Sequence, residues 1–485
     1  MKNKNSFYII LGIEILAILL AVFGILPREI VLISTGIMVF YFIFSPVEDS
    51  LILFIISIPL WVALPITESF DTMANWRILL VILFLVWFFR KREWMRIKER
   101  IFRNSRLTKF VILFLFIGFL SLFVATNLIV GIKKILFLIN IFLLFPIIQD
   151  IAKDEKQRLR IIKAGALALI ISLIVGYSQI IITLATPLYD FWQGWASKVI
   201  PVFYGNNLSE LLKVSNTWFS YYPDSPPTLR MFSVFPDSHS FALFIIIGLI
   251  FLVYLLKDKK AFWVGIALSF LALISSGSRG VWLSAVIPFL AIIYLVIFKK
   301  EKILKPFILM LIIFALSFPV SSLILSQARQ DGEDATLAFK RAKSITDLEE
   351  LSVKSRLGIW KTSLQSILNH PILGVGIGNY PVVLGEDISA AKKGASAHNL
   401  YLDVASEMGL LGLIALLLIF LEILKFSFKK INQFAFTFFF VWILIYNLFD
   451  VVLLNDKVLL FFMVVLGLLY STNHEKISIN KHLNV

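Results

Sequence analysis

Long apolar runs alternate with short charged clusters along the whole chain. Most of the apolar runs span roughly 15 to 25 residues, and an α-helix needs about 20 predominantly apolar residues to cross a bilayer. The pattern therefore predicts an all-α, polytopic integral membrane protein with about 12–14 transmembrane helices. The apolar runs lie near residues 6–26, 29–45, 50–66, 76–90, 109–126, 128–149, 161–184, 234–256, 261–276, 281–298, 306–325, 400–424, 434–454 and 458–471.

The basic clusters predict how these helices are oriented. Every large Lys and Arg cluster falls on the same side of the sequence of spans, and by the positive-inside rule that side is cytoplasmic. The opposite, extracytoplasmic side then carries two long loops, residues 185–233 and 326–398, of which the second is partly helical. The clusters lie at residues 90–109, 153–163, 257–260, 299–305 and 425–430.

The composition narrows the class of protein further. Of the 485 residues, 59% are hydrophobic and 16% are charged, so we expect one transmembrane domain over residues 1–485 and no separate soluble module. The net charge of +15 is spread over the loops, and we therefore do not expect nucleic acid as a partner. The chain has no cysteine, which excludes disulfides and thiolate metal sites.

His398 is the first candidate for chemistry, because it lies directly before the apolar run that begins at Leu400. This position predicts an imidazole at a bilayer surface, where both water and a lipid-borne substrate can reach it. An imidazole titrates near pH 6.5 in the absence of perturbation, which suits a general base that removes a proton from a substrate hydroxyl. The alternative is a structural histidine at the membrane interface.

Two arginines are candidates for binding an anion on the same side. Arg279 lies in the serine- and glycine-rich turn at residues 275–280, and a guanidinium matches phosphate oxygens in a bidentate way. Arg356 opens residues 356–370, whose apolar positions recur at helical spacing and predict an amphipathic helix on the outer membrane surface. The alternatives are an interfacial arginine that snorkels or caps a helix for Arg279, and a solvated charge for Arg356.

Other motifs argue against further sites. The glycines of residues 371–380 lack the Lys-Ser/Thr ending of a phosphate loop and predict a loop that turns back toward the membrane. None of the five histidines has another four residues away, and the acidic run at residues 331–334 does not match an EF-hand, so we expect no metal site and no cofactor. Lys133 and Lys134 are expected to snorkel rather than to bind substrate.

Three of these motifs together resemble the O-antigen ligase and polymerase superfamily of bacterial membrane glycosyltransferases. They are the Ser-Gly-Ser-Arg-Gly turn at residues 276–280, the segment 356–380, and His398-Asn399 followed by Gly409 and Gly412. The resemblance covers roughly residues 230–425, which we treat as the core region of the family.

A weaker match begins at Arg230, which the resemblance makes a candidate for substrate contact. The family segment usually reads Arg-x-x-Gly-x-Phe-x-Asp-Pro-Asn. This chain has Ser233 at the glycine position and Pro-Asp-Ser-His at residues 236–239 in place of the last part. These departures leave Asp237 and His239 without an assigned role.

The resemblance implies a metal-independent, inverting transfer of a glycan from an undecaprenyl-diphosphate-type donor to the hydroxyl of a glycan or lipid-glycan acceptor. The reaction would take place among membrane lipids at the extracytoplasmic face of the bacterial inner membrane, as a step of cell-surface polysaccharide biosynthesis. His398 would activate the acceptor hydroxyl, while Arg279 and Arg356 would bind the diphosphate.

Ligase-type activity is our first choice, and a repeat-unit polymerase of the same superfamily is the alternative. A lipid-linked glycan transporter or flippase is the competing class of protein. That class predicts charges buried at mid-span in several helices, of which Glu14 is the clearest instance.

Overall fold

The structure is a computed structural model that describes residues 4–67, 70–91, 106–214, 217–222, 225–255, 259–299, 305–327, 351–385, 396–428 and 434–471. In the first half of the chain the helices are α1 Lys4–Val22, α2 Ile30–Phe44, α3 Val47–Ile56, α4 Trp76–Arg90, α6 Arg106–Ser121, α7 Leu128–Phe142, α8 Leu144–Ile151, α9 Glu155–Ala185, α10 Leu188–Gly194, α11 Ile200–Tyr204 and α12 Asn206–Lys213. In the second half they are α13 Ser238–Tyr254, α14 Lys259–Ser275, α15 Arg279–Ile297, α16 Lys305–Gln327, α18 Leu351–Asn369, α19 Tyr380–Val383, α20 Leu400–Phe428, α21 Phe434–Tyr446 and α22 Asp456–Tyr470.

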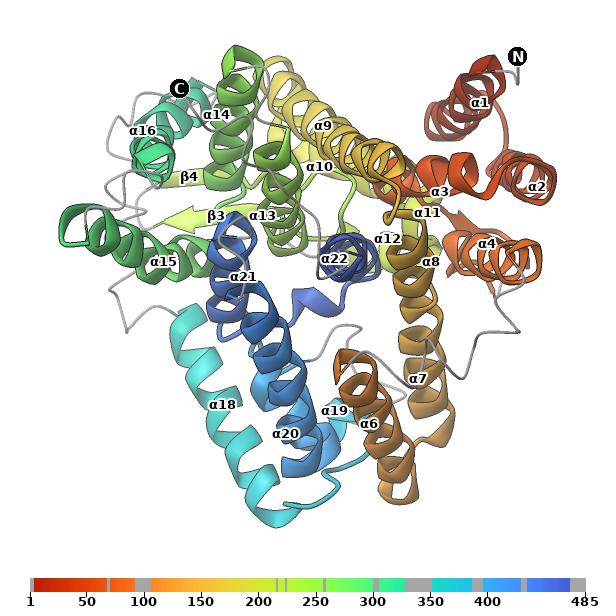
Figure 1. Cartoon of the computed structure of the whole chain (residues 1–485). Helices are drawn as coiled ribbons and strands as arrows, with labels where there is room; N and C mark the ends of the chain where they lie inside the picture. The colour runs from red at the N-terminus through yellow and green to blue at the C-terminus, as the bar shows by residue number, and fades with distance from the viewer. Residues whose placement is uncertain are drawn as a thin grey trace.

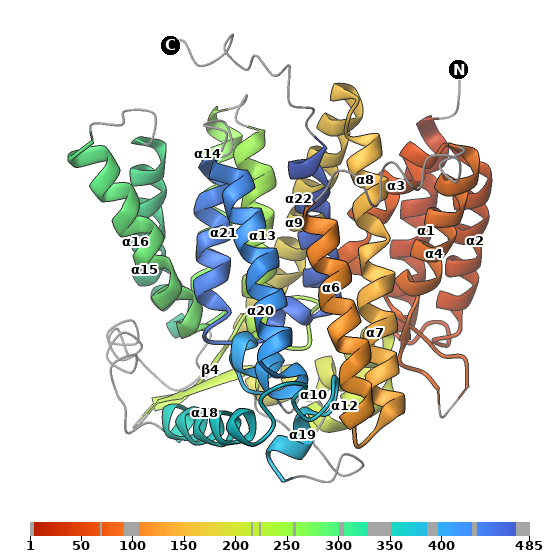
Figure 2. The same cartoon turned by 60° about the horizontal axis from the view of Figure 1, so that its bottom comes forward.

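Most of the long helices run side by side as one bundle (Figures 1 and 2). Helix α1 begins and α22 ends at the upper end of the bundle in Figure 2, which we call the terminus end. The opposite end, which we call the loop end, carries α10, α12, α18 and α19. Among the described residues, six helices are long and apolar enough to cross a membrane, and further apolar helices have 10–17 residues. The predicted all-α, polytopic architecture is therefore confirmed.

Three predicted spans end earlier than expected or are divided. The run 50–66 is helical only to Ile56 and continues as a 3-10 turn, Ile58–Leu60, and a short strand, because Pro59 cannot donate a backbone hydrogen bond to a continuing α-helix. The run 128–149 lies in one candidate membrane span, Leu128–Ile151, which is interrupted where α7 meets α8, since the Pro146 ring would clash with the carbonyl four residues before it. The run 434–454 is helical only to the end of α21 and then forms a connection.

The strands form two small antiparallel pairs outside the bundle helices. They are β1 Ala63–Leu64 with β2 Met73–Ala74, and β3 Phe219–Tyr222 with β4 Ser225–Leu229. The second pair lies within the predicted loop 185–233, so that loop is more ordered than its sequence indicated. In the other predicted loop, residues 328–350 and 386–395, which include the acidic run, lie outside the described residues.

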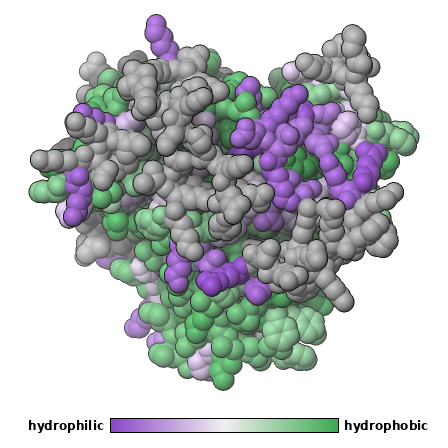
Figure 3. Space-filling view, in the orientation of Figure 1, coloured by the Kyte–Doolittle hydropathy of each residue, from purple (hydrophilic) through white to green (hydrophobic). Residues whose placement is uncertain are grey.

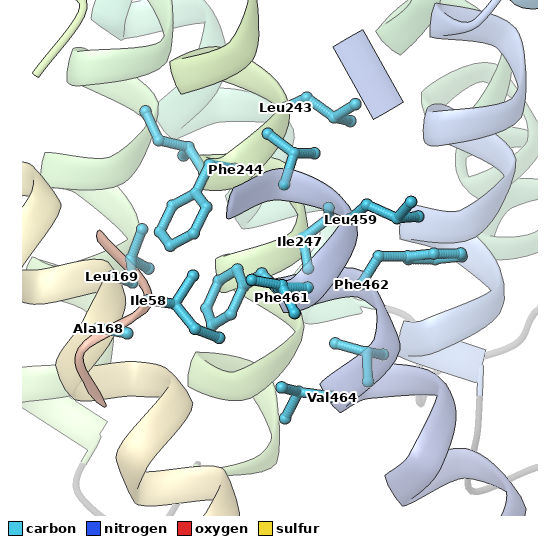
Figure 4. Packing of buried hydrophobic residues seen from close by; sticks show 14 of the residues in the cluster. Ile58, Ala168, Leu169, Leu243, Phe244, Ile247, Leu459, Phe461, Phe462 and Val464 are labelled. Atoms are coloured by element: carbon cyan, nitrogen blue, oxygen red, sulfur yellow. The ribbon is translucent and has the colours of Figure 1, made fainter. Parts of the chain in front are cut away.

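Helices α13 and α22 form the centre of the molecule. Both are apolar around most of their circumference and almost entirely buried, as expected for helices that have protein on every side. The Phe244 ring of α13 stacks on the Phe461 ring of α22 with centroids 4.1 Å apart (Figure 4). Ala168 and Leu169 of α9 and Ile58 lie in the same cluster (Figure 4).

The outer surface of the bundle is apolar over wide areas. Figure 3 shows a largely hydrophobic surface in the lower part of the view, where Figure 1 places α6, α18 and α20. Phe116 and Phe119 of α6 are more than half exposed. Exposed apolar surface of this extent indicates contact with lipid.

Helix α18 lies across the loop end of the bundle rather than along it (Figure 2). It covers the predicted helix over residues 356–370 and begins five residues earlier, at Leu351. Leu357, Leu364 and Leu368 are exposed, while Ser363 and Ile367 are buried against the bundle. An exposed leucine row on a helix that lies across the bundle end suits a membrane surface.

Helix α20 is broken at Gly409, which has φ +66° and ψ −172°. A side chain there would be strained, and its Cβ would come within 2.1 Å of the Ile372 carbonyl oxygen. The break divides α20 into a buried first part, residues 400–408, and a lipid-facing second part, residues 410–428, on which Leu410 and Ile414 are exposed.

Candidate functional site

Polar side chains from four separate segments meet at the loop end of the bundle. We call this group the His398 cluster: Arg230, His239, Ser278, His398 and Asp450. His239 lies at its centre, with Nε2 3.1 Å from an Arg230 guanidinium nitrogen and Nδ1 2.8 Å from the Ser278 hydroxyl. Its Nδ1 is also 3.6 Å from the Asp450 carboxylate. The cluster therefore joins the starts of α13 and α15 to the connection that follows α21.

His398 itself adopts a strained backbone conformation. Its φ is +47°, a region that costs a side-chain-bearing residue about 1–2 kcal/mol. The residues on both sides fix this conformation: the Ala397 amide donates to the Asp403 carboxylate at 3.0 Å, and the Leu400 amide donates to the Asn447 carbonyl at 2.8 Å. Backbone strain that the surroundings enforce is a common property of functional sites.

Two further side chains hold the same segment. The Trp360 indole of α18 donates to the Ala397 carbonyl at 3.0 Å. The Asn399 side chain accepts from the Tyr401 and Leu402 amides and so caps α20. The segment that carries His398 is thus held between α18 and the capped start of α20.

Asp450 lies beside the His398 ring. Its Oδ1 is 3.9 Å from the imidazole Nδ1, with the carboxylate side chain 6% exposed and the imidazole 41% exposed. This separation is longer than a hydrogen bond, and such contacts often shorten when substrate binds. The arrangement directs Nδ1 toward a buried acid and leaves the rest of the ring accessible.

The surroundings of Asp450 favour its ionised form. Burial raises the pKa of its carboxyl group, but the nearby His239, His398 and Arg356 together lower it below its usual value. The carboxylate also accepts a hydrogen bond from the Val451 amide at 2.8 Å. A buried, ionised carboxylate next to a partly exposed imidazole is an orienting pair of the kind used in general-base catalysis.

The structure brings the predicted arginines to this part of the molecule. The Arg230 side chain donates to the Ser276 and Gly277 carbonyls at 3.3 and 3.4 Å, which ties it to the turn that precedes α15. Arg279 is the half-buried first residue of α15, directly after Ser278. Arg356 of α18 is close enough to Asp450 to lower the pKa of that carboxyl. All four predicted site residues therefore lie at the loop end.

Ser233 occupies the position where the family segment usually has glycine, and its φ is +55°. The Ser233 amide donates to the Gln179 side chain at 2.9 Å, and its hydroxyl donates to the Ser172 carbonyl at 2.6 Å. These bonds hold a serine in a backbone conformation that glycine adopts without strain. Asp237 has a structural position, because it caps α13 by accepting from the Ser240 amide at 2.7 Å.

Asp450, Tyr446 and Ser278 were not predicted as site residues, and His239 had no predicted role. The Tyr446 hydroxyl lies 3.0 Å from the Ser278 hydroxyl and 3.3 Å from His239 Nδ1. A signal for Asp450 is present in the sequence, since it is the only charged residue between Lys430 and Asp456. Asp450 was missed because residues 434–454 were predicted as one span.

Lys134 does not snorkel, contrary to the prediction. Its ammonium lies 2.5 Å from the Glu407 carboxylate and 4.0 Å from the Asp403 carboxylate, both of which are buried. We call these three residues the Lys134 cluster. Because its ammonium is already paired with two buried carboxylates, the Lys134 cluster holds α7 against α20 and is not a candidate for binding a diphosphate. Within the described residues, no group of three His, Cys, Asp or Glu side chains is arranged to hold a metal ion.

A family model described as O-antigen ligase matches residues 264–417. That match assigns this region to the O-antigen ligase superfamily. It covers about a third of the chain and contains Arg279, Arg356 and His398, whereas Arg230 and Asp450 lie outside it. None of the curated proteins compared with the chain matches it.

The O-antigen ligase match and the apolar helices support a multi-pass membrane enzyme of the ligase or polymerase type. The matched region runs from α14 through the turn before α15, across α18, and into the second part of α20. It therefore holds one side of the His398 cluster, while α13 and the connection after α21 supply the other side.

Proposed function

We propose that this chain is an O-antigen ligase-like glycosyltransferase that moves a polyprenyl-diphosphate-linked glycan to an acceptor hydroxyl. The observation that carries the proposal is the His398 imidazole 3.9 Å from the buried Asp450 carboxylate, with Arg356 near that carboxylate and Arg230 in contact with the neighbouring His239. A base with an ionised partner and several guanidinium groups nearby matches a reaction that takes up a proton and releases a diphosphate.

In the proposed reaction, His398 accepts the proton of the acceptor hydroxyl as that oxygen attacks the anomeric carbon of the donor. The new carbon–oxygen bond forms while the bond from the anomeric carbon to the diphosphate breaks. The electron pair leaves with the polyprenyl diphosphate, and Arg279 and Arg356 stabilise its added negative charge. Attack from the face opposite the leaving group inverts the anomeric carbon, and no metal ion is required.

Asp450 has a positioning role in this scheme. Its carboxylate stabilises the imidazolium that forms when His398 takes up the proton, and it selects the ring orientation. Arg230 holds the turn that carries Arg279 through the Ser276 and Gly277 carbonyls. Its guanidinium lies within the His398 cluster, which makes it a candidate for direct substrate contact.

We also propose that the loop end faces the extracytoplasmic side of the bacterial cytoplasmic membrane. The basic connections that follow α4, α8, α13, α15 and α20 all belong to the opposite, terminus end, as the positive-inside rule requires for that orientation. Parts of these connections, including residues 92–105 and 300–304, lie outside the described residues. An active site on this face receives its donor as a lipid already carried across the membrane.

The test is transfer by the purified protein in lipid nanodiscs. Polyprenyl-diphosphate-linked oligosaccharide is supplied as donor, with either a lipid-glycan acceptor or no acceptor beyond the donor itself. New glycoside on the added acceptor, with release of polyprenyl diphosphate, supports a ligase. A ladder of lengthened donor chains supports the polymerase instead.

Two arginine variants test the diphosphate role. Arg279→Lys and Arg356→Lys keep the charge but lose the bidentate fork, so each is expected to lower transfer by about tenfold or more. Lys361→Gln, which removes an exposed charge on α18, is the matched control and should leave transfer unchanged. Donor that moves between leaflets without any new glycosidic bond would overturn the proposal in favour of a flippase.

A further inference from the structure

A second candidate site lies at the terminus end of the bundle, at the opposite end from the His398 cluster. A cavity of about 850 Å³ opens there between α1, α2, α3, α4 and α9. It is outside the region that matches the O-antigen ligase family, and no step of the proposed reaction uses it. Its lining divides into a basic part and an apolar part.

The basic part carries three cations, Arg90, Arg160 and Lys163, and a single carboxylate, Asp49. Arg160 pairs with Asp49 at 2.5 Å. Arg90 donates through both terminal nitrogens to the Ser45 and Ile43 carbonyls at the end of α2, and it pairs with no carboxylate among the described residues. Lys163 makes no hydrogen bond or ion pair with any residue that the structure describes. The lining therefore has a net charge of about +2, and the Lys163 ammonium has donors available for an anion.

The apolar part begins directly beside these charges. Ile52 and Ile56 of α3 form its buried wall, and Leu167 of α9 continues it. Phe44 and Tyr8, at the rim, are each 70% exposed. Aromatic side chains with this exposure on membrane-spanning helices contact lipid, so the cavity opens toward the bilayer.

We propose that this cavity binds one anionic glycerophospholipid. Its phosphate lies between Lys163, Arg160 and Arg90, and one acyl chain follows the wall formed by Ile52, Ile56 and Leu167. The charge excess selects an anionic headgroup over a zwitterionic one, because basic pockets between membrane helices attract anionic lipid headgroups. The adjoining apolar wall selects a lipid over a free phosphate ion, since only a lipid fills both parts.

The experiment is native mass spectrometry of the full-length protein released from nanodiscs made of equimolar phosphatidylglycerol and phosphatidylcholine. Wild-type protein is expected to retain one phosphatidylglycerol. Lys163→Gln should weaken retention about fivefold, the effect of one basic side chain near an anionic lipid surface. Arg160→Gln combined with Lys163→Gln should abolish selective retention.

Lys156→Gln is the matched control, because Lys156 is an exposed lysine on the same helix, α9, that does not line the cavity. Glycerol phosphate serves as a soluble competitor that tests the acyl-chain requirement. Equal retention by wild type and the double variant, equal retention of both lipids, or displacement by glycerol phosphate as effective as by phosphatidylglycerol would each overturn the proposal. The result does not bear on the proposed glycosyl transfer, because the experiment measures only the mass of the retained lipid.

Discussion

The Lys134 cluster and the His398 cluster both lie at the first turns of α20. They differ in whether they leave a titratable side chain accessible. In the Lys134 cluster, the ammonium lies 2.5 Å from Glu407 and 4.0 Å from Asp403. In the His398 cluster, the imidazole is 41% exposed and 3.9 Å from its acidic neighbour. In the first group the cation is paired with buried carboxylates, whereas the second keeps an accessible imidazole beside a buried acid.

The two groups are also connected. Asp403 belongs to the Lys134 cluster and accepts the hydrogen bond of the Ala397 amide, the residue before His398. The paired charges of the Lys134 cluster therefore hold the backbone that presents the accessible histidine. Buried charge by itself does not identify a reactive centre, and what distinguishes one is a titratable group that its neighbours orient but do not neutralise.

Replacing His398 by Ala gives the largest expected effect. If His398 is the base, transfer falls about 10²–10⁴-fold, while the thermal midpoint of unfolding stays within a degree or two because the side chain is partly exposed. Transfer is measured as new glycoside from a polyprenyl-diphosphate-linked donor. The control is His370→Ala, which changes an exposed histidine directly after α18. An equal loss of transfer in both variants would contradict a specific role for His398.

Lys134→Met is expected to act on stability instead. It leaves two carboxylates buried without their cation, which costs about 3 kcal/mol and lowers the midpoint of thermal unfolding in detergent. Adding Glu407→Gln should restore part of that loss. The neighbouring exposed lysine provides the control variant Lys133→Met. A stable Lys134→Met protein that has lost transfer would instead assign Lys134 to the site.

Asp450→Asn tests the orienting acid. It should lower transfer about 10–100-fold, less than the loss of the base itself. The midpoint of thermal unfolding should change little, because the asparagine keeps the shape of the side chain. A loss of transfer matched by a large loss of stability would point to a purely structural role.

Asp450→Asn should also change how the stability of the protein depends on pH. The pKa of Asp450 is depressed in the folded protein. The ionised carboxylate therefore stabilises the folded state fully above the ordinary carboxyl pKa of about 4, and this stabilisation is lost as the pH falls below that value. Thermal unfolding measured from neutral to acidic pH should therefore decline less steeply in Asp450→Asn than in wild type.

Gly409→Ala should destabilise the protein by about 2 kcal/mol. The backbone conformation at Gly409 lies in a region that is essentially restricted to glycine and costs an alanine about 1–3 kcal/mol. The added methyl group would also lie 2.1 Å from the Ile372 carbonyl oxygen, so the backbone would have to shift. Gly36→Ala, within α2 and with no atom close to the added methyl, is the control and should be neutral or slightly stabilising. Similar midpoints for the two variants would show that the break in α20 relaxes easily.

Trp360→Phe has the smallest expected effect. It removes the hydrogen bond from the indole to the Ala397 carbonyl, which is worth about 1 kcal/mol, and keeps most of the aromatic contact. Transfer should fall by no more than about fivefold, with the midpoint of unfolding only slightly lower. A loss as large as that of His398→Ala would mean that α18 does more than support the histidine segment.

The fold was largely predictable because each helix in a membrane must satisfy its own backbone hydrogen bonds, so apolar runs become helices. Prolines explain where helices differ from the apolar runs. The helix in the run 50–66 ends before Pro59, and Pro146 interrupts the helix within the span Leu128–Ile151. The β3–β4 pair was also missed, since its strands lie in a loop whose aromatic residues gave no clear alternation.

The candidate site was only partly predictable. Arg279, Arg356 and His398 lie within recognisable motifs, and the structure gathers them at one end of the bundle. Asp450 lies in an otherwise apolar stretch, and its place beside His398 depends on the packing of α21 against α20, a tertiary contact that no local pattern encodes. His239 had no predicted role for a different reason, because its segment departs from the usual family sequence.

The break at Gly409 has a consequence for how the enzyme responds to its bilayer. A helix that is too long or too short for the surrounding hydrocarbon tilts to compensate, and a straight α20 would transmit that tilt to His398. With the break, residues 410–428 can tilt with the lipid while residues 400–408 stay clamped among protein side chains. The break would thereby keep changes of tilt in residues 410–428 from reaching His398, so the proposed site would keep its geometry in bilayers of different acyl-chain length.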